Sequence, residues 1–148
     1  MDVSLLRNKK IGVIGAARSG IAVARLLRSQ GARVLVSDKT GPDRLKAEAQ
    51  TLSELGIEHE LGGHSERVYD CSLMVISPGV PSNAPVLVEA RARGTKVVSE
   101  VEVAGWFCRS PIVAITGSNG KTTTTTLIGR ILGDAKKNHA VAGNIGTA

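Results

Sequence analysis

One segment, residues 111–132, constrains the fold of this chain more than any other. It begins with the apolar run Pro111-Ile-Val-Ala-Ile115, passes through a turn that contains two glycines, and ends in apolar residues at helical spacing. A helix that begins directly after such a turn has unsatisfied backbone N–H groups at its N-terminus, where they attract anions. The segment therefore predicts a strand, a phosphate-binding loop and a helix, in that order.

The turn also contains the side chains that a nucleotide requires. Gly117 and Gly120 allow tight curvature, Lys121 can reach the β and γ oxygens of a nucleoside triphosphate, and the Thr122 hydroxyl can bind Mg²⁺. The spacing differs from the common phosphate-loop motif, which would place a glycine where this chain has Ile115. The alternative is a glycine-containing turn with a surface lysine. We favour the phosphate loop because strand, turn, Gly-Lys-Thr and helix follow in order.

The first half of the chain alternates short apolar runs with helical patterns, which is typical of a parallel α/β fold. An apolar run at 10–15, a turn at 16–20, a helical pattern that ends at Gly31 and a second run at 33–38 predict the opening unit of a doubly wound, Rossmann-like sheet. Further helices are expected at 44–55, 86–93 and 100–107, the last capped by Ser99, and further strands at 57–61, 72–77, 96–98 and 139–142.

The turn after the first strand resembles a dinucleotide fingerprint in part. Gly15 and Gly20 fit the motif G-x-G-x-x-G, but Ala17 replaces the glycine that lets a pyrophosphate approach the backbone, which weakens the case for NAD. Asp38, at the end of the second strand, could bind a sugar hydroxyl or could cap a turn. Gly79 follows another strand and is either a ligand contact or a turn glycine. A nicotinamide-dependent oxidoreductase is therefore one alternative.

The net charge of +6 and the pI of about 9.8 favour anionic partners, either polyphosphate ligands or nucleic acid. The basic residues are scattered, and Tyr69, Trp106 and Phe107 are the only aromatic side chains on which bases could stack. We therefore expect small phosphates and no nucleic acid. A nucleotide-sensing or nucleic-acid-binding module is the second alternative.

The histidines and cysteines indicate no metal centre. His59 and His64 flank two glycines without cysteine or carboxylate at ligand spacing, so we expect surface residues. Cys71 and Cys108 form no C-x-x-C pair and are expected to be reduced thiols. Neither a signal peptide nor a membrane-spanning run is evident. We expect a cytoplasmic monomer without a membrane partner.

A domain boundary is expected after residue 98, where a complete series of strands and helices ends. The second unit, at 99–148, is short against the roughly 100 to 200 residues of a typical domain. We therefore expect a Rossmann-like domain followed by the truncated start of a P-loop ATPase domain, within a longer protein.

The loop sequence at 116–124, Thr-Gly-Ser-Asn-Gly-Lys-Thr-Thr-Thr, resembles the ATP loop of the Mur ligases, which are ATP-dependent amide-bond ligases of peptidoglycan synthesis. Gly15 with Ser19-Gly20, Ser77-Pro-Gly79 and Gly143-Asn-Ile-Gly146 support the resemblance, which runs through the whole chain. It points most closely to the member that adds D-glutamate to UDP-N-acetylmuramoyl-L-alanine. Another Mur-type ligase is the alternative.

The resemblance implies a UDP-substrate-binding domain at 1–98 and the beginning of a central ATP-binding domain at 99–148. The alanine carboxylate of the substrate would attack the γ-phosphate of ATP, and the amine of D-glutamate would capture the acyl phosphate. By matching position, the UDP substrate would contact Arg18, Ser19, Asp38, Lys39, Thr40, Gly79 and Asn144. ATP would contact Gly117, Ser118, Asn119, Gly120, Lys121, Thr122 and Thr123, with Lys121 catalytic and Mg²⁺ on Thr122. Other parts of the machinery would lie beyond Ala148, so this chain alone should not catalyse ligation.

Overall fold

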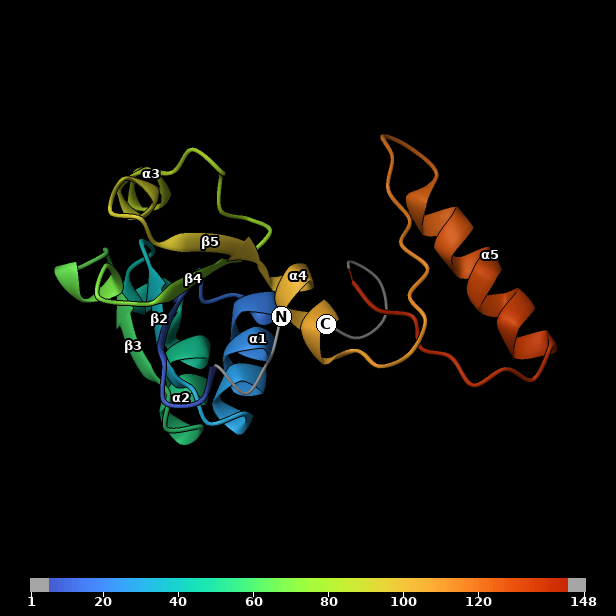
Figure 1. The fold of residues 1–148 in the computed structure, drawn as a ribbon, viewed down its shortest axis with the longest axis horizontal. Coiled ribbons are helices and arrows are strands. Elements are labelled where there is room, and N and C mark those ends of the chain that lie inside the picture. Colours follow the sequence, from blue (N-terminus) through green and yellow to red (C-terminus); the bar gives the residue numbers. More distant parts are fainter. Residues whose placement is uncertain (1–5, 144–148) are drawn as a thin grey trace. The chain divides into compact units, whose positions relative to one another are not determined.

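The computed structural model describes residues 6–143, which form two units that divide after Cys108. The first unit is a parallel sheet covered by helices on both faces (Figure 1). Its strands are β1 (Lys10–Ile14), β2 (Arg33–Asp38), β3 (Glu58–Leu61), β4 (Leu73–Ile76) and β5 (Lys96–Ser99). Its α-helices are α1 (Arg18–Ser29), α2 (Lys46–Glu54), α3 (Pro85–Ala92) and α4 (Glu100–Phe107), with short 3₁₀ turns η2 (Pro42–Arg44) and η3 (Glu66–Val68).

The strand order is β3-β2-β1-β4-β5. The chain begins in the middle of the sheet, adds β2 and β3 on one side, and then crosses to β4 and β5 on the other. This order creates a switch point between β1 and β4, and ligands of doubly wound folds bind beside the carboxyl ends of the strands at such a point. The predicted Rossmann-like sheet is therefore confirmed.

Alternate residues of each central strand face two separate apolar cores. In β2, Val34 and Val36 pack on the side of α1, α2 and α4, whereas Leu35 packs on the side of α3. Because both faces are covered, these strands are almost continuously apolar, as parallel strands require. A polar residue within such a strand, here the fully buried Ser37, must find hydrogen-bond partners.

Helix α4 belongs to the first unit, which corrects the expected boundary after residue 98. Val103 is fully buried in the core, and Trp106 and Phe107 pack against it. The predicted cap is present, since Ser99 Oγ accepts a hydrogen bond of 3.1 Å from the Glu102 N–H. The apolar side of α4 completes the core that covers one face of the sheet, so the unit extends to Cys108.

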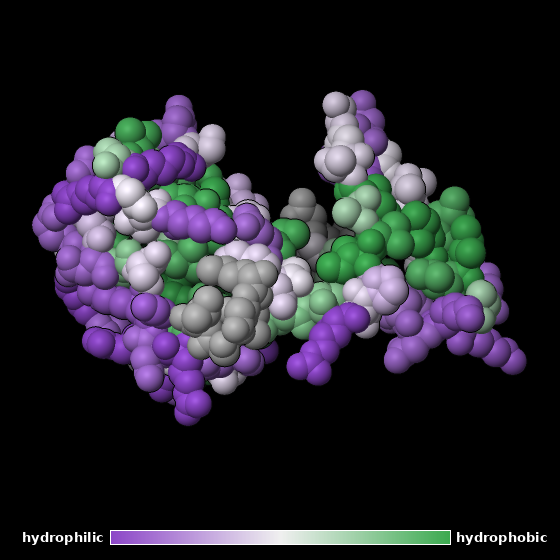
Figure 2. Space-filling view, viewed as in Figure 1, coloured by the Kyte–Doolittle hydropathy of each residue, from purple (hydrophilic) through white to green (hydrophobic). Residues whose placement is uncertain are grey.

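The second unit contains α5 (Lys121–Asp134). The strands predicted at 111–115 and 139–142 are not formed in the described chain, apart from one bridge residue at Ala142. Ile112 and Val113 are 63% and 65% exposed, and apolar side chains gather on one face of this unit in Figure 2. A parallel strand needs neighbouring strands for its hydrogen bonds, and residues 109–143 supply none.

None of the helices in the described residues is both long enough and apolar enough to cross a membrane.

The turn from β1 to α1 depends on a close backbone approach at Gly20. A Cβ atom at this position would lie 1.9 Å from the Gly15 carbonyl oxygen and 2.9 Å from Ser77 Oγ. Ser77 is buried, and its hydroxyl donates to the Gly15 carbonyl at 3.3 Å. The beginning of α1 is thereby packed directly against the ends of β1 and β4.

We expect Gly20→Ala to destabilise the first unit by about 2–3 kcal/mol, because the added methyl group meets backbone that cannot move aside. Urea denaturation followed by fluorescence of Trp106, the single tryptophan, reports this unit. Gly79→Ala is the control, since a Cβ there has no neighbour within 4 Å. An unchanged midpoint for Gly20→Ala would contradict the close approach.

Candidate functional site

The residues predicted to bind the UDP substrate lie at one edge of the sheet. Arg18 and Ser19 form the first turn of α1, Asp38 ends β2, Lys39 and Thr40 follow it, and Gly79 occupies the exposed turn after β4. Because all five strands are parallel, their carboxyl ends share this edge. The structure therefore brings these predicted residues to the same edge. Asn144, the remaining one, lies outside the described residues.

The N-terminus of α1 has the character of an anion site. Its N-cap residue is Ala17, no side chain caps it, and its first turn contains no acidic residue. The backbone N–H groups of this turn carry partial positive charge, and the exposed Arg18 adds a full one. The arrangement suits a diphosphate.

Asp38 joins this turn to the loop after β2. Its Oδ2 accepts a hydrogen bond from the Ala16 N–H and its Oδ1 accepts one from the Thr40 N–H, both at 2.8 Å. Burial alone would raise the pKa of Asp38, but hydrogen bonds from Ala16 and Thr40 and the nearby His64 together lower it. The carboxylate thus has the turn-capping role that the sequence left open. A carboxylate has about four acceptor positions, so Asp38 can still accept a further hydrogen bond, and the sugar contact stays a prediction.

The loop after β3 is hydrogen-bonded to the loop after β2. The Gly62 N–H lies 2.9 Å from the Asp38 and Thr40 carbonyl oxygens, and the Gly63 N–H donates to the Asp38 carbonyl at 3.2 Å. The ends of β1, β2 and β3 are therefore connected by hydrogen bonds that all meet at residues 38–40.

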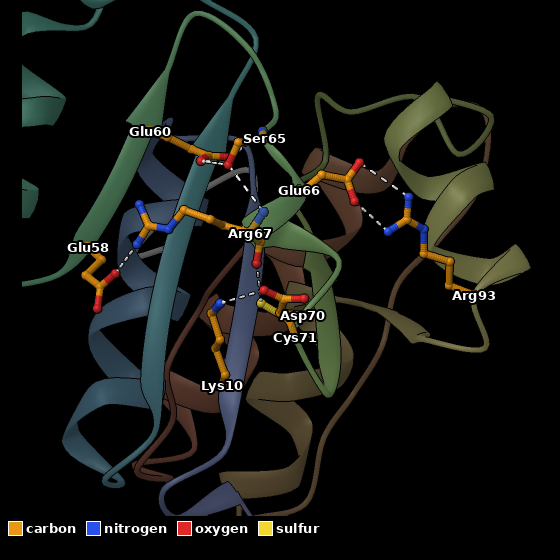
Figure 3. Close-up of polar contacts among 9 residues, drawn as sticks. All are labelled: Lys10, Glu58, Glu60, Ser65, Glu66, Arg67, Asp70, Cys71 and Arg93. Carbon is orange, nitrogen blue, oxygen red and sulfur yellow. Dashed lines mark hydrogen bonds and ion pairs between the residues drawn. The ribbon is translucent and has the colours of Figure 1, made fainter.

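A second set of hydrogen bonds fixes the loop after β3 from the other face of the sheet. Ser37 Oγ lies 2.8 Å from Glu60 Oε1 and 2.7 Å from His64 Nδ1. Glu60 also accepts from the Ser65 N–H at 3.0 Å and from the Ser65 hydroxyl at 2.6 Å. Figure 3 shows the Glu60 and Ser65 side chains turned toward each other. These four residues, Ser37, Glu60, His64 and Ser65, are called the Ser37 network below.

His64 was predicted to be a surface residue, and the structure shows a partly buried ring that contacts a fully buried serine. Burial lowers the pKa of His64, and Lys39 adds to this, while Glu60 and Asp38 oppose it without reversing it. The signal that could have revealed this contact is Ser37 itself, a polar residue within an apolar strand, with Glu60 beside it in register.

Surface ion pairs lie near Glu60 and Ser65 of the Ser37 network, as Figure 3 shows. Arg67 of η3 contacts Glu58 of β3, and Arg93 reaches from the end of α3 to Glu66 at 2.7 Å. All four side chains are exposed, so each pair contributes little to stability. They link η3 to β3 on one side and to the end of α3 on the other.

The predicted phosphate loop at 117–123 leads into α5. Gly120 precedes the helix with φ of +76°, a conformation that favours glycine, and no side chain caps the helix. Lys121 Nζ donates to the carbonyl oxygens of Gly117 and Ser118, the latter at 3.3 Å. The lysine therefore lies against its own loop, with Ser118, Asn119, Thr122 and Thr123 exposed around it.

No three His, Cys, Asp or Glu side chains in residues 6–143 are grouped to hold a metal ion. Mg²⁺ at the Thr122 hydroxyl would therefore need most of its oxygen ligands from nucleotide phosphates, water or residues outside this range.

Two solved structures share this architecture. A pseudomurein peptide ligase type C from Methanothermus fervidus is 33% identical with a TM-score of 0.58, and the match covers 86% of this chain and 26% of the ligase chain. The UDP-N-acetylmuramate-alanine ligase MurC from Thermotoga maritima is 27% identical with a TM-score of 0.55, and the match covers 86% of this chain and 30% of the MurC chain. The fold and the Gly-Lys-Thr loop thus define a chain of the Mur ligase class.

The family is more specific than the class. The family profile described as the MurD N-terminal domain matches residues 10–86, just over half of the chain, and the chain belongs to this family. The UDP-N-acetylmuramoylalanine--D-glutamate ligase of Chlorobaculum parvum is 51% identical over 152 residues, which cover 99% of this chain and 32% of that protein. The chain spans about a third of the length of such relatives.

We expect the stability of the first unit to decrease as the pH falls below about 6.5, because His64 has a lower pKa in the folded chain than its ordinary value of 6.5. The unfolded chain then binds a proton that the folded chain binds only at lower pH, so protonation favours unfolding. Urea denaturation at several values between about pH 7.5 and 5.5, followed by Trp106 fluorescence, measures this slope.

His64→Asn should reduce that slope, and His59→Asn should leave it unchanged. His59 is a matched control because it is also partly buried, and within residues 6–143 its ring hydrogen-bonds to the carbonyl of Ile57, at 3.2 Å, and not to a buried side chain. Equal slopes for wild type and His64→Asn would contradict the assignment of the effect to His64.

Proposed function

We propose that this chain is the N-terminal part of an ATP-dependent ligase that adds D-glutamate to UDP-N-acetylmuramoyl-L-alanine. The observation that carries the proposal is the 51% identity, over 99% of this chain, to a protein of that name. The position of Arg18, Ser19, Asp38, Lys39, Thr40 and Gly79 at one edge of the sheet supports it. A cytoplasmic location and a monomeric state stay predictions.

In the first unit, the uncapped N-terminus of α1 and Arg18 would hold the diphosphate of the UDP substrate. The loop at Asp38, Lys39 and Thr40 would bind the uridine, with Gly79 beside it. The hydrogen bonds that join these loops hold them in place before the substrate arrives, so less ordering is needed on binding. The first unit would therefore bind the UDP substrate without the nucleotide.

In the second unit, Lys121 would exchange the carbonyl oxygens of Gly117 and Ser118 for phosphate oxygens of ATP. Mg²⁺ fits the exposed Thr122 hydroxyl and would neutralise phosphate charge. The substrate carboxylate would then attack the γ-phosphate and release ADP, and the amine of D-glutamate would displace phosphate to form the amide. The groups that bring D-glutamate are expected outside the described residues.

We expect Lys121→Ala in the full-length enzyme to lower kcat by at least about 10³-fold, because phosphoryl transfer depends on charge neutralisation at the transferred group. Affinity for UDP-N-acetylmuramoyl-L-alanine should stay within about twofold of wild type, since a different unit holds it. Steady-state kinetics and calorimetric titration measure the two effects. Equal loss of both in a folded variant would contradict this division.

We expect Asp38→Ala to weaken binding of the same ligand by about 1–3 kcal/mol, the cost of leaving a buried polar partner unpaired. Calorimetric titration of the chain gives the affinity. Asp43→Ala is the control, because the Asp43 side chain is 94% exposed and forms only a 3.8 Å surface ion pair. If a folded Asp38→Ala variant binds as wild type does, Asp38 has only its turn-capping role.

A further inference from the structure

The proposed mechanism leaves the Ser37 network unused, although this network lies directly behind the proposed uridine loop. Ser37 and Asp38 are consecutive residues of β2, so their side chains point to opposite faces of the sheet. Asp38 reaches the turn after β1 through the Ala16 N–H, whereas Ser37 reaches the loop after β3 through Glu60 and His64. One strand end therefore fixes a loop on each side.

The direction of the hydrogen bonds follows from the chemistry of the groups. Burial would raise the pKa of Glu60, but Ser65, Ser37 and Arg67 together lower it, so its carboxylate is ionised and can only accept. The single hydroxyl proton of Ser37 is therefore donated to Glu60 at 2.8 Å, since the other acceptor, the Gly63 carbonyl oxygen, lies farther away at 3.4 Å. His64 Nδ1 must then carry the imidazole proton and donate it to Ser37 Oγ, which leaves Nε2 as the unprotonated nitrogen.

The contact between His64 and Ser37 also restrains the two glycines that precede His64 in the chain. His64 directly follows Gly62 and Gly63, whose N–H groups donate to the Asp38 and Thr40 carbonyls. If His64 is released, the Gly62-Gly63 turn keeps only the long contact of 3.4 Å between the Ser37 hydroxyl and the Gly63 carbonyl on that side. The two N–H groups that fix the backbone of the loop at 38–40 are then held less firmly. A ligand that needs this loop in one conformation would then bind more weakly, in proportion to the fraction of molecules that still adopt it.

We infer that His64 is a positioning residue of the UDP-substrate site, which acts through Ser37 and the Gly62-Gly63 turn to hold the Asp38–Thr40 loop in its binding conformation. The inference rests on the proposed function, because the ligand is the UDP substrate. It assigns to His64 a role that does not require contact with the ligand. The essential atom is Nδ1 with its proton, and Nε2 is not needed.

The test compares substitutions that separate the two ring nitrogens. His64→Asn keeps an N–H donor near the position of Nδ1 and removes Nε2, whereas His64→Ala removes both. Ser37→Ala breaks the same contact from the other end and also removes the hydrogen bond to Glu60, and His59→Ala is the matched control on β3. Each variant of the whole chain is titrated calorimetrically with UDP-N-acetylmuramoyl-L-alanine, and Trp106 fluorescence confirms that the first unit is folded.

We expect His64→Ala to weaken binding by about three- to tenfold, which corresponds to the loss of one ordinary hydrogen bond. Ser37→Ala should weaken binding at least as much, because it also removes the hydrogen bond to Glu60. His64→Asn should restore most of the affinity, and His59→Ala should bind as wild type does. Hydrogen exchange of the Gly62 and Gly63 amides should accelerate by a similar factor in His64→Ala and recover in His64→Asn, with no ligand present.

Two results would overturn the inference while the proposed function stands. Wild-type affinity for a folded His64→Ala variant would show that the loop does not need His64. Equal loss in His64→Asn and His64→Ala, with amide exchange unchanged, would show that Nε2 contacts the ligand directly. If the folded wild-type chain does not bind the UDP ligand, the proposed function fails, and the positioning role fails with it.

Discussion

The partly buried carboxylate of Asp38 forms the hydrogen bonds on which the candidate site depends. Its two oxygens accept backbone hydrogen bonds from Ala16 and Thr40, and the backbone carbonyls of residues 38 and 40 accept from Gly62. Three loops that follow separate strands are therefore fixed relative to one another by groups that must be satisfied in any case, since buried polar groups without partners are costly. The edge that parallel strands share thereby becomes an ordered surface.

Much of the first unit could be predicted from local patterns. The alternation of apolar runs and helical periodicity located all five strands and the helices, because both periods are local properties of the chain. The cap at Ser99 was predictable for the same reason. The boundary was placed ten residues too early, because no local signal tells whether the apolar side of α4 packs against the preceding sheet or begins a new core.

The missed residues are those that depend on contacts between distant segments. Two histidines beside a glycine pair look alike in sequence, yet His64 bonds to Ser37, 27 residues earlier, whereas the His59 ring bonds to the carbonyl of Ile57, two residues earlier. The strands predicted in the second unit were wrong for a related reason. Their apolar residues are suited to a sheet, but a strand also needs partners, and Ile112 and Val113 stay exposed without them.

The central claim is that the first unit binds the UDP substrate by itself. The most direct test is calorimetric titration of this chain, without ATP, with UDP-N-acetylmuramoyl-L-alanine and, separately, with NAD⁺. The account predicts saturable binding of the UDP ligand at one site per chain and no binding of NAD⁺, because Ala17 takes the place of the glycine that a dinucleotide pyrophosphate requires. Binding of NAD⁺ alone by the folded chain would contradict it.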